Sequence, residues 1–263
     1  MYAFTYHRAN DVADAVQALG AENAKILAGG QTLLPTMKQR LASPGVLIDL
    51  GRLGDLRGVE DRGDTLVIKA MTTHNEVAQS PVVARAVPGL EKLALVIGDP
   101  AVRHRGTIGG SVANNDPSAD YPAACLALQA TIVTDRRRVP ADEFFQGLFT
   151  TALEENELVT AVEFPHVDSF AYGKFRNPAS RYALVGVAIA KKGDDVRVAV
   201  TGSGSDGVFR WPEAEERLKA DFSPGALDGL KGDASTLVGD IHASPEYRAH
   251  LMGVMARRAL EGV

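Results

Sequence analysis

The sequence predicts an α+β protein, in which a two-part α/β region is followed by a smaller domain with an antiparallel sheet and helices. Strand-like and helix-like segments alternate as far as Pro165, as they do in α/β architectures. Two glycine pairs, Gly29-Gly30 and Gly109-Gly110, interrupt this alternation, and each is followed by a hydroxyl residue. Further on, the polar stretch 191–195 separates two apolar segments, which is typical of an antiparallel hairpin.

These changes in pattern place a boundary between residues 165 and 172. The predicted domains are therefore residues 1–168 and residues 169–263, and the first is expected to divide into two α/β subdomains near residues 55–60. In chain order, the first domain is expected to contain an edge strand from Tyr2 to Tyr6, a helix at 12–19 capped by Asn10, strands at 25–28 and 46–49, a helix at 33–41, a strand at 66–70, and helices at 74–78 and 88–97.

The later elements follow from the same periodicities. They are a helix from Pro117 to Leu128, a strand at 131–134, a short helix at 144–145, strands at 158–164, 182–190 and 196–201, and closing helices at 212–218 and 245–260.

Composition excludes several function classes. The chain has 263 residues with 45% hydrophobic and 23% charged content, as in ordinary globular proteins, and its formal net charge of −5 argues against a nucleic-acid partner. The basic run Arg136-Arg137-Arg138 is interpreted as a solvated hairpin tip. No apolar run reaches the length of a membrane span and the first residues lack a signal-peptide pattern, so a cytoplasmic location is predicted.

The cysteine and histidine content bears on redox chemistry. Cys125 is the only cysteine, so this chain cannot supply the several thiolates that an iron–sulfur cluster needs, and its apolar surroundings predict a buried thiol. The six histidines form no pair at ligand spacing. We therefore predict no metal bound by this chain, and any redox chemistry must come from an organic cofactor.

The two glycine pairs are the candidate binding elements. Glycine lets a ligand approach the backbone closely, and a glycine turn that runs into a helix offers N–H groups to an anion, most often phosphate. Two such turns that converge could hold a pyrophosphate from both sides, with Arg103 and Arg105 making the second one locally cationic. The alternative is that both are ordinary tight turns between packed elements.

A third glycine-rich segment is assigned as a loop. Residues 202–207 match the G-x-G-x-x-G dinucleotide pattern. That pattern requires a parallel βαβ unit, whereas the preceding strand belongs to a predicted hairpin.

Several segments together resemble a known family. Residues 28–34 (AGGQTLL), 103–111 (RHRGTIGGS) and 116–120 (DPSAD), followed by 182–188 and 240–248, are similar to the FAD-binding medium subunit of molybdenum hydroxylases, the xanthine dehydrogenase and carbon monoxide dehydrogenase family. The resemblance covers essentially the whole chain. It implies an FAD-binding domain of the vanillyl-alcohol-oxidase (PCMH) type, which is not a Rossmann fold.

The resemblance also implies the site. The two glycine turns would bind the FAD pyrophosphate through backbone N–H groups, Ile97 would pack near the flavin or ribityl chain, and Asp120 would hydrogen-bond toward the nucleotide. The implied cofactor-binding residues are Leu27, Ala28, Gly29, Gly30, Gln31, Thr32, Leu33, Leu34, Ile97, Thr107, Ile108, Gly109, Gly110, Ser111, Asn114, Asp120, Val159 and Lys174. Read from the sequence alone, Asp120 could instead cap its helix and Lys174 could be an ordinary strand lysine.

The implied function is electron transfer. In this family the substrate is oxidised at molybdenum in a large subunit, and electrons cross [2Fe-2S] clusters in a small subunit to FAD in the medium subunit, which passes them to an external acceptor. The resemblance implies both subunits as partners, in a dimer of heterotrimers. No side chain of this chain needs to act as an acid or base, so no catalytic residue is predicted. Carbon monoxide, purines, aldehydes and N-heterocycles all stay open as substrates of the complex.

Two other functions are carried as alternatives. The chain could be a stand-alone FAD-dependent oxidoreductase with its own substrate pocket, or a flavin-free assembly module of the same fold. A flavin absorption spectrum separates the assembly module from the two flavin-binding functions. Co-purification with molybdenum- and iron-containing chains separates the electron-transfer subunit from the stand-alone oxidoreductase.

Overall fold

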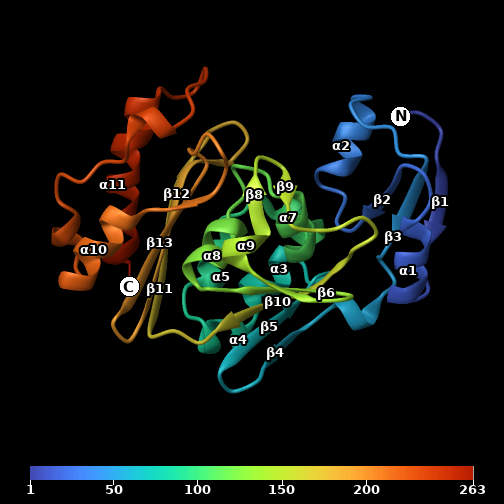
Figure 1. The fold of residues 1–263 in the computed structure, drawn as a ribbon, viewed down its shortest axis with the longest axis horizontal. Helices are drawn as coiled ribbons and strands as arrows, with labels where there is room; N and C mark the ends of the chain where they lie inside the picture. Colours follow the sequence, from blue (N-terminus) through green and yellow to red (C-terminus); the bar gives the residue numbers. More distant parts are fainter. Residues whose placement is uncertain (263) are drawn as a thin grey trace.

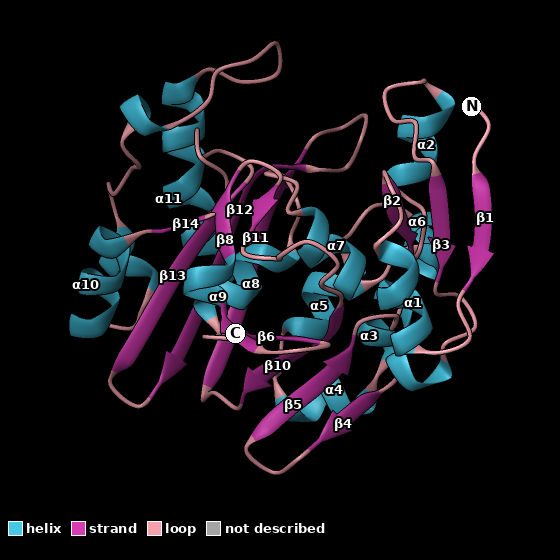
Figure 2. Ribbon diagram, turned by 45° about the vertical axis from the view of Figure 1, so that its right-hand side comes forward, coloured by secondary structure: helices cyan, strands magenta, loops and turns pink. Residues whose placement is uncertain are grey.

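Three β-sheets organise the molecule, as a computed structural model of residues 1–262 shows (Figure 1). A small N-terminal sheet lies at one end, a five-stranded sheet in the middle, and a C-terminal sheet with two helices at the other end (Figures 1 and 2). Within residues 1–262, no helix combines the length and the apolar character that crossing a membrane requires.

The N-terminal sheet is parallel. Its strands are β1 (Thr5–Arg8), β2 (Ala24–Leu27) and β3 (Val46–Asp49) in the order β1-β3-β2, and the helices α1 (Val12–Leu19) and α2 (Leu33–Lys38) supply the crossovers that parallel neighbours need. The predicted edge strand is confirmed, although it begins at Thr5. The predicted cap was wrong by one residue, because the carboxylate of Asp11, not Asn10, accepts the Asp14 N–H (2.8 Å).

The middle sheet is antiparallel throughout. It has the order β4-β5-β10-β6-β7 and consists of β4 (Val59–Asp61), β5 (Thr65–Lys69), β6 (Thr131–Thr134), β7 (Arg138–Pro140) and β10 (Val159–Pro165). A short 3-10 turn, η1 (Gly54–Leu56), connects it to the N-terminal sheet. Although strands and helices alternate along this part of the chain, every strand pair in the sheet is antiparallel. Six of the intervening helices lie in one insertion between β5 and β6.

That insertion is a layer of six short helices. They are α3 (His74–Gln79), α4 (Pro81–Ala86), α5 (Leu90–Leu95), α6 (Pro100–Arg105), α7 (Ile108–Asn114) and α8 (Tyr121–Ala127). The predicted helix over 88–97 is confirmed as α5, with shorter bounds. No helix was predicted at α4 or α6, which was wrong. Both missed helices begin with proline after a capping side chain, Ser80 or Asp99, a start signal that apolar periodicity does not detect.

The C-terminal sheet is antiparallel, in the order β11-β12-β13-β14. Its elements are β11 (Ser169–Arg176), β12 (Ala183–Lys192), β13 (Asp195–Thr201) and β14 (Phe209–Arg210), with α10 (Pro212–Ala220), η2 (Pro224–Leu227), η3 (Ala234–Thr236) and α11 (Pro245–Glu261). A helical turn α9 (Ala141–Phe144) and a ribbon of β8 (Phe145–Gly147) and β9 (Thr150–Thr151) complete the fold. The predicted hairpin and both closing helices are confirmed, and 202–207 is a loop between antiparallel β13 and β14.

The two faces of the C-terminal sheet carry different side chains. Ala188, Ala190 and Ala199 share a core with the small residues of α8, whereas the valines on the other face pack against α10 and α11. Cys125 of α8 is fully buried in the first of these cores, as the sequence predicted, and burial raises the pKa of its thiol.

A buried arginine ties α11 to this sheet. Arg248 is 2% exposed, and its guanidinium donates to the carbonyls of Leu184 (2.6 Å) and Gly202 (2.8 Å) and to the Asp240 carboxylate (2.7 Å). The guanidinium thus bridges the two segments at the open end of the β12–β13 hairpin, away from its connecting turn.

Replacing Arg248 should strongly destabilise the protein. In Arg248→Met two buried carbonyls lose their donor, so we expect a loss of about 3 kcal/mol or more in the free energy of unfolding, measured by urea denaturation. Arg258→Met, at an exposed position of the same helix, is the matched control and should change it by less than about 0.5 kcal/mol. Equal effects of the two variants would contradict this account.

Candidate functional site

A cavity of about 1100 Å³ separates the N-terminal sheet from the helical layer and the C-terminal sheet. Both glycine pairs line it, together with Lys25 of β2, Lys174 of β11 and the loop between β9 and β10. Segments that are far apart in the sequence thus meet at one cleft.

The first glycine turn lies directly against the second. A Cβ on Gly29 would lie 2.1 Å from the carbonyl oxygen of Arg105 and 2.7 Å from Gly106 Cα, and Gly30 has a φ of 71°. Only glycine allows this contact between two backbones. The predicted convergence of the two turns is therefore confirmed.

The second turn differs from its prediction. The sequence predicted a helix only from Pro117, whereas α6 precedes the second glycine pair and Gly109 and Gly110 lie inside the first turn of α7. The Thr107 hydroxyl caps this helix by accepting the Gly110 N–H (3.2 Å). Gly109 is needed because a Cβ there would lie 2.5 Å from Ala70 Cβ.

The two turns also differ in their free donors. The N–H groups of Ile108 and Gly109 are already bonded to the carbonyls of Thr72 (3.1 Å) and Ala70 (2.9 Å). By contrast, the backbone N–H groups of residues 29–32 find no protein acceptor within residues 1–262. The first turn therefore offers backbone donors to the cavity, and the second offers chiefly the hydroxyls of Thr107 and Ser111.

A buried ion pair joins α8 to the C-terminal sheet at the cavity wall. Lys174 Nζ donates to Asp120 Oδ2 (2.8 Å) and to the Val96 carbonyl (3.1 Å), and the two paired side chains are only 3% and 4% exposed. The Tyr172 hydroxyl donates to Asp120 Oδ1 (2.5 Å). Asp120 makes no cap bond to its own helix, so the capping alternative is wrong. Lys174 does lie in a strand, but its buried ion pair sets it apart from the ordinary strand lysine of the alternative.

The loop before α8 is fixed by the same sheet. The Thr201 hydroxyl donates to the carbonyls of Ala119 (2.7 Å) and Pro117 (3.0 Å), and the Gly202 N–H donates to Pro117 (2.8 Å). The C-terminal sheet therefore holds one wall of the cavity from behind.

Most of the predicted site residues share this cavity. Those that line it are Ala28, Gly29, Gly30, Gln31, Thr32, Leu33, Ile97, Thr107, Gly109, Gly110, Ser111, Asn114, Asp120, Val159 and Lys174. Leu27, Leu34 and Ile108 do not. Leu27 and Leu34 instead pack at Gly30, and Ile108 is fully buried in the core of the helical layer.

Other residues of the lining were not predicted. They are chiefly Ala21 to Lys25, His74, Asp116, Glu154 to Leu158 and Ser180 to Tyr182. Burial raises the pKa of the Asp116 carboxyl. Most of these residues lie in connections without periodicity, so the sequence carries no local signal for them. Within residues 1–262, no group of three or more His, Cys, Asp or Glu side chains is placed to hold a metal ion.

His74 begins α3 behind the second turn. Its side chain is buried, its backbone N–H donates to the Gly106 carbonyl (2.9 Å), and Thr73 forms a capping box with Glu76, which confirms the predicted helix start. Burial, and secondarily the charge of Arg103, lowers the pKa of His74 from 6.5 to about 4.

The low pKa of His74 predicts acid sensitivity. Between pH 6.5 and 4 the unfolded chain binds a proton at this histidine and the folded chain does not, so stability falls as the pH falls. The loss should be about 2 kcal/mol at pH 5 relative to pH 7. Urea denaturation at several pH values should give free energies of unfolding for the wild-type protein and His74→Gln whose difference changes by this amount between pH 7 and pH 5. A difference that stays constant with pH would contradict the low pKa of His74.

The Asp120–Lys174 pair predicts a second stability effect. In Lys174→Met the buried carboxylate loses its cation, so we expect a loss of about 3 kcal/mol or more in the free energy of unfolding. Lys219, whose ion pair with Glu216 is exposed, provides the control, because Lys219→Met should cost less than about 1 kcal/mol. Chemical denaturation measures both, and a Lys174→Met variant as stable as the control would refute the role of the pair.

Comparisons with known proteins agree with this geometry. Residues 2–167 match the family model described as the FAD binding domain in molybdopterin dehydrogenase, and residues 170–263 match the one described as the CO dehydrogenase flavoprotein C-terminal domain. The carbon monoxide dehydrogenase medium chain of Hydrogenophaga pseudoflava is 37% identical, over 98% of this chain and 96% of that one. The nicotine 6-hydroxylase medium subunit of Paenarthrobacter nicotinovorans is 36% identical, again over 98% and 96%.

Solved structures show the same fold. A carbon monoxide dehydrogenase structure from Hydrogenophaga pseudoflava superposes with a TM-score of 0.89 at 37% identity, covering 99% of this chain and 96% of the other. Quinoline 2-oxidoreductase from Pseudomonas putida 86 gives a TM-score of 0.87 at 29% identity, with the same coverage. The chain therefore belongs to the family of FAD-binding medium subunits of the molybdenum hydroxylases.

Proposed function

We propose that this chain passes electrons from a [2Fe-2S] small subunit through FAD to an external acceptor, within a complex that oxidises its substrate at molybdenum in a large subunit. The relatives named as medium chains and medium subunits support this role, as do the two family models that match residues 2–167 and 170–263. We also propose that the chain divides into domains at residues 1–168 and 169–263. We further propose a dimer of heterotrimers as the assembly.

The observation that carries the proposal is the meeting of the two glycine turns in one cavity. A Cβ on Gly110 would lie 3.6 Å from Ala28 Cβ and 3.0 Å from the Thr107 hydroxyl, so the two turns face each other at close range. The N–H groups of residues 29–32 and the hydroxyls of Thr107 and Ser111 fit the oxygens of a diphosphate. The residues present therefore fit FAD, and the first turn is the main backbone donor.

The residues around the cavity have positioning roles. When bound, the flavin accepts electrons singly and gives them up in pairs, which joins a one-electron relay to a two-electron acceptor. Asp120, held by Lys174 and Tyr172, presents a fixed carboxylate to the wall, and Ile97 provides apolar contact. No acid or base is required of this chain.

Purification of the native assembly tests the proposal. The chain should co-purify with one molybdenum-containing and one iron–sulfur-containing subunit, and the complex should show flavin absorption. A flavin spectrum without partner subunits would indicate a stand-alone oxidoreductase. Partner subunits without a flavin spectrum would indicate an assembly module.

A substitution at Gly110 should abolish cofactor binding with little effect on the fold. The side chain of Gly110→Val would enter the gap between the turns, and a Cβ at this position lies 3.0 Å from the Thr107 hydroxyl and farther from other atoms. We expect flavin content, measured by absorption after purification, to fall at least about tenfold. Gly54→Val, at an exposed glycine where an added Cβ would meet no heavy atom within 4 Å, should retain full flavin content. Normal flavin in Gly110→Val would contradict the diphosphate position.

A further inference from the structure

The lining of the cavity comes from elements on opposite sides of the molecule, which we call its two ends, and one of them has no assigned ligand group. Ile97, Lys174 and Tyr182 line one end, beside the C-terminal sheet. Residues 21–25 and the loop 154–158 line the other, beside the N-terminal sheet. If the diphosphate lies between the turns and the flavin lies beside Ile97, as proposed above, the adenosine of FAD occupies the second end.

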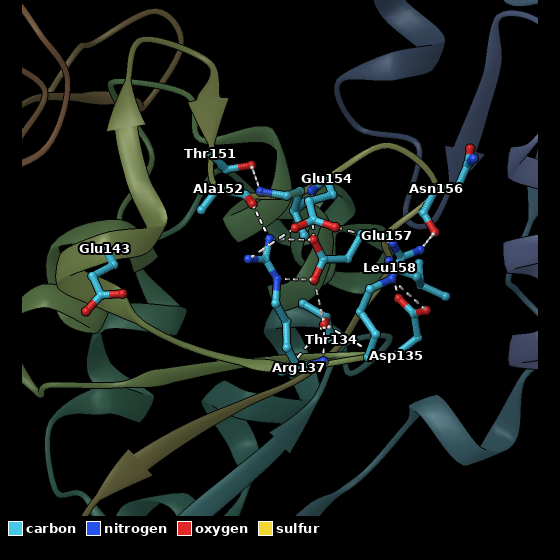
Figure 3. A network of polar contacts seen from close by, with 12 residues as sticks. Thr134, Asp135, Arg137, Glu143, Thr151, Ala152, Glu154, Asn156, Glu157 and Leu158 are labelled. Carbon is cyan, nitrogen blue, oxygen red and sulfur yellow. Dashed lines mark hydrogen bonds and ion pairs between the residues drawn. The ribbon is translucent and has the colours of Figure 1, made fainter.

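The loop that forms this end lies outside the middle sheet. Residues 152–158 connect β9 to β10 and bend toward the N-terminal sheet (Figures 1 and 3). Asn156 in this loop has a left-handed backbone with a φ of 61°. Within residues 1–262, backbone bonds to other elements hold only the two ends of the loop, where the Ala152 N–H donates to Phe144 (2.8 Å) and the Asp135 N–H donates to Leu158 (2.9 Å). Between these ends, the position of the loop depends on side chains that reach it from neighbouring elements.

Arg137 is the main such side chain. It leaves the β6–β7 hairpin and binds both carboxylate oxygens of Glu157, with Nε–Oε1 and Nη2–Oε2 distances of 2.8 Å (Figure 3). Its Nη2 also donates to the Ala152 carbonyl (2.5 Å) at the other end of the loop. One guanidinium therefore joins both ends of the loop to the hairpin.

Glu157 accepts further hydrogen bonds that hold the loop in place. Its side chain is fully buried and accepts the Thr134 hydroxyl (2.8 Å) and the Glu154 N–H (2.7 Å) in addition to Arg137. Next to it, the Asp135 carboxylate accepts the Leu158 N–H (2.7 Å). Arg137 and the other donors lower the pKa of Glu157 to about 2, so the carboxylate stays charged at any working pH.

We propose that Arg137, through its pair with Glu157, is a positioning residue that sets the adenosine end of the FAD site. The guanidinium does not line the cavity, but Glu154, Glu157 and Leu158 do, and their backbone is held by this pair. The basic run at 136–138, predicted as a solvated hairpin tip, does lie at a hairpin, but its central arginine supports the cofactor site. The inference rests on the proposed function.

Comparing FAD with FMN separates a defect in adenosine binding from a general disturbance of the whole cofactor site. The native assembly is depleted of cofactor, and dissociation constants for FAD, ADP and FMN are measured by titration. FMN lacks the adenosine, so a defect at this end should leave its binding unchanged. Arg137→Met is expected to weaken the binding of FAD and ADP at least about tenfold, and the binding of FMN by less than about twofold.

A neighbouring arginine provides the matched control. Arg138 makes an equivalent two-point contact with Glu163, on β10 outside the loop, so Arg138→Met should leave all three constants unchanged. Glu157→Gln, which keeps the shape but removes the charge, should shift FAD and ADP in the same direction by a smaller factor. It keeps the test valid if Arg137→Met does not fold.

Each remaining outcome has a defined meaning. If the wild-type assembly binds FAD, and the Arg137 and Glu157 variants bind FAD and ADP as tightly as the wild type does, this inference is wrong and the proposed function stands. Equal weakening of FAD and FMN would show a general structural role and also overturn it. A wild-type assembly that binds neither FAD nor ADP would overturn the proposed function, and this inference with it.

Discussion

Direct contact between two peptide backbones is the constraint on which the site depends. Gly29 lies against the carbonyl of Arg105 and the Cα of Gly106, where even a methyl group would be too close. This contact brings the N-terminal sheet up to the helical layer and places the free N–H groups of residues 29–32 opposite Thr107. A bulkier residue at position 29 would push the two walls of the cleft apart. The other contacts across the cavity depend on the distance between these walls.

The C-terminal sheet has a second, less obvious share in the site. Its strands provide Lys174 and Tyr172 to Asp120, and Thr201 to the loop that precedes it. These contacts are polar and buried, so they are specific in geometry, and losing one partner leaves another group unpaired. The sheet therefore does more than cover the core, because it determines where Asp120 points.

Sequence patterns predicted much of the fold and part of the site. The strand Val46–Asp49 was predicted with its observed bounds, because a short apolar run between turn signals is typical of a buried strand. The helices at 81–86 and 100–105 were missed because proline and a capping side chain start them, not periodicity. The Gly109-Gly110 pair was found for its lack of side chains, but the close packing of Gly109 against Ala70, about forty positions away in the chain, has no local signal.

Long-range partners explain the rest. Nothing near Lys174 in the sequence indicates Asp120, and nothing near Arg137 indicates Glu157. Each pair forms only when segments that are distant in the chain meet. The resemblance to a family supplied Asp120 and Lys174 as candidates, and it supplied no partner for Arg137. Spacing arguments work within an element, whereas these ion pairs join different sheets and loops.

The bonds from Thr201 and Gly202 to Pro117 and Ala119 also have a consequence for how the chain matures. During synthesis the N-terminal sheet and the helical layer emerge first, and the loop before α8 lacks its buried donors until β13 has left the ribosome. The cleft then acquires its final shape late, once nearly the whole chain exists. A chain that ends before β13 would leave the carbonyls of Pro117 and Ala119 without these donors.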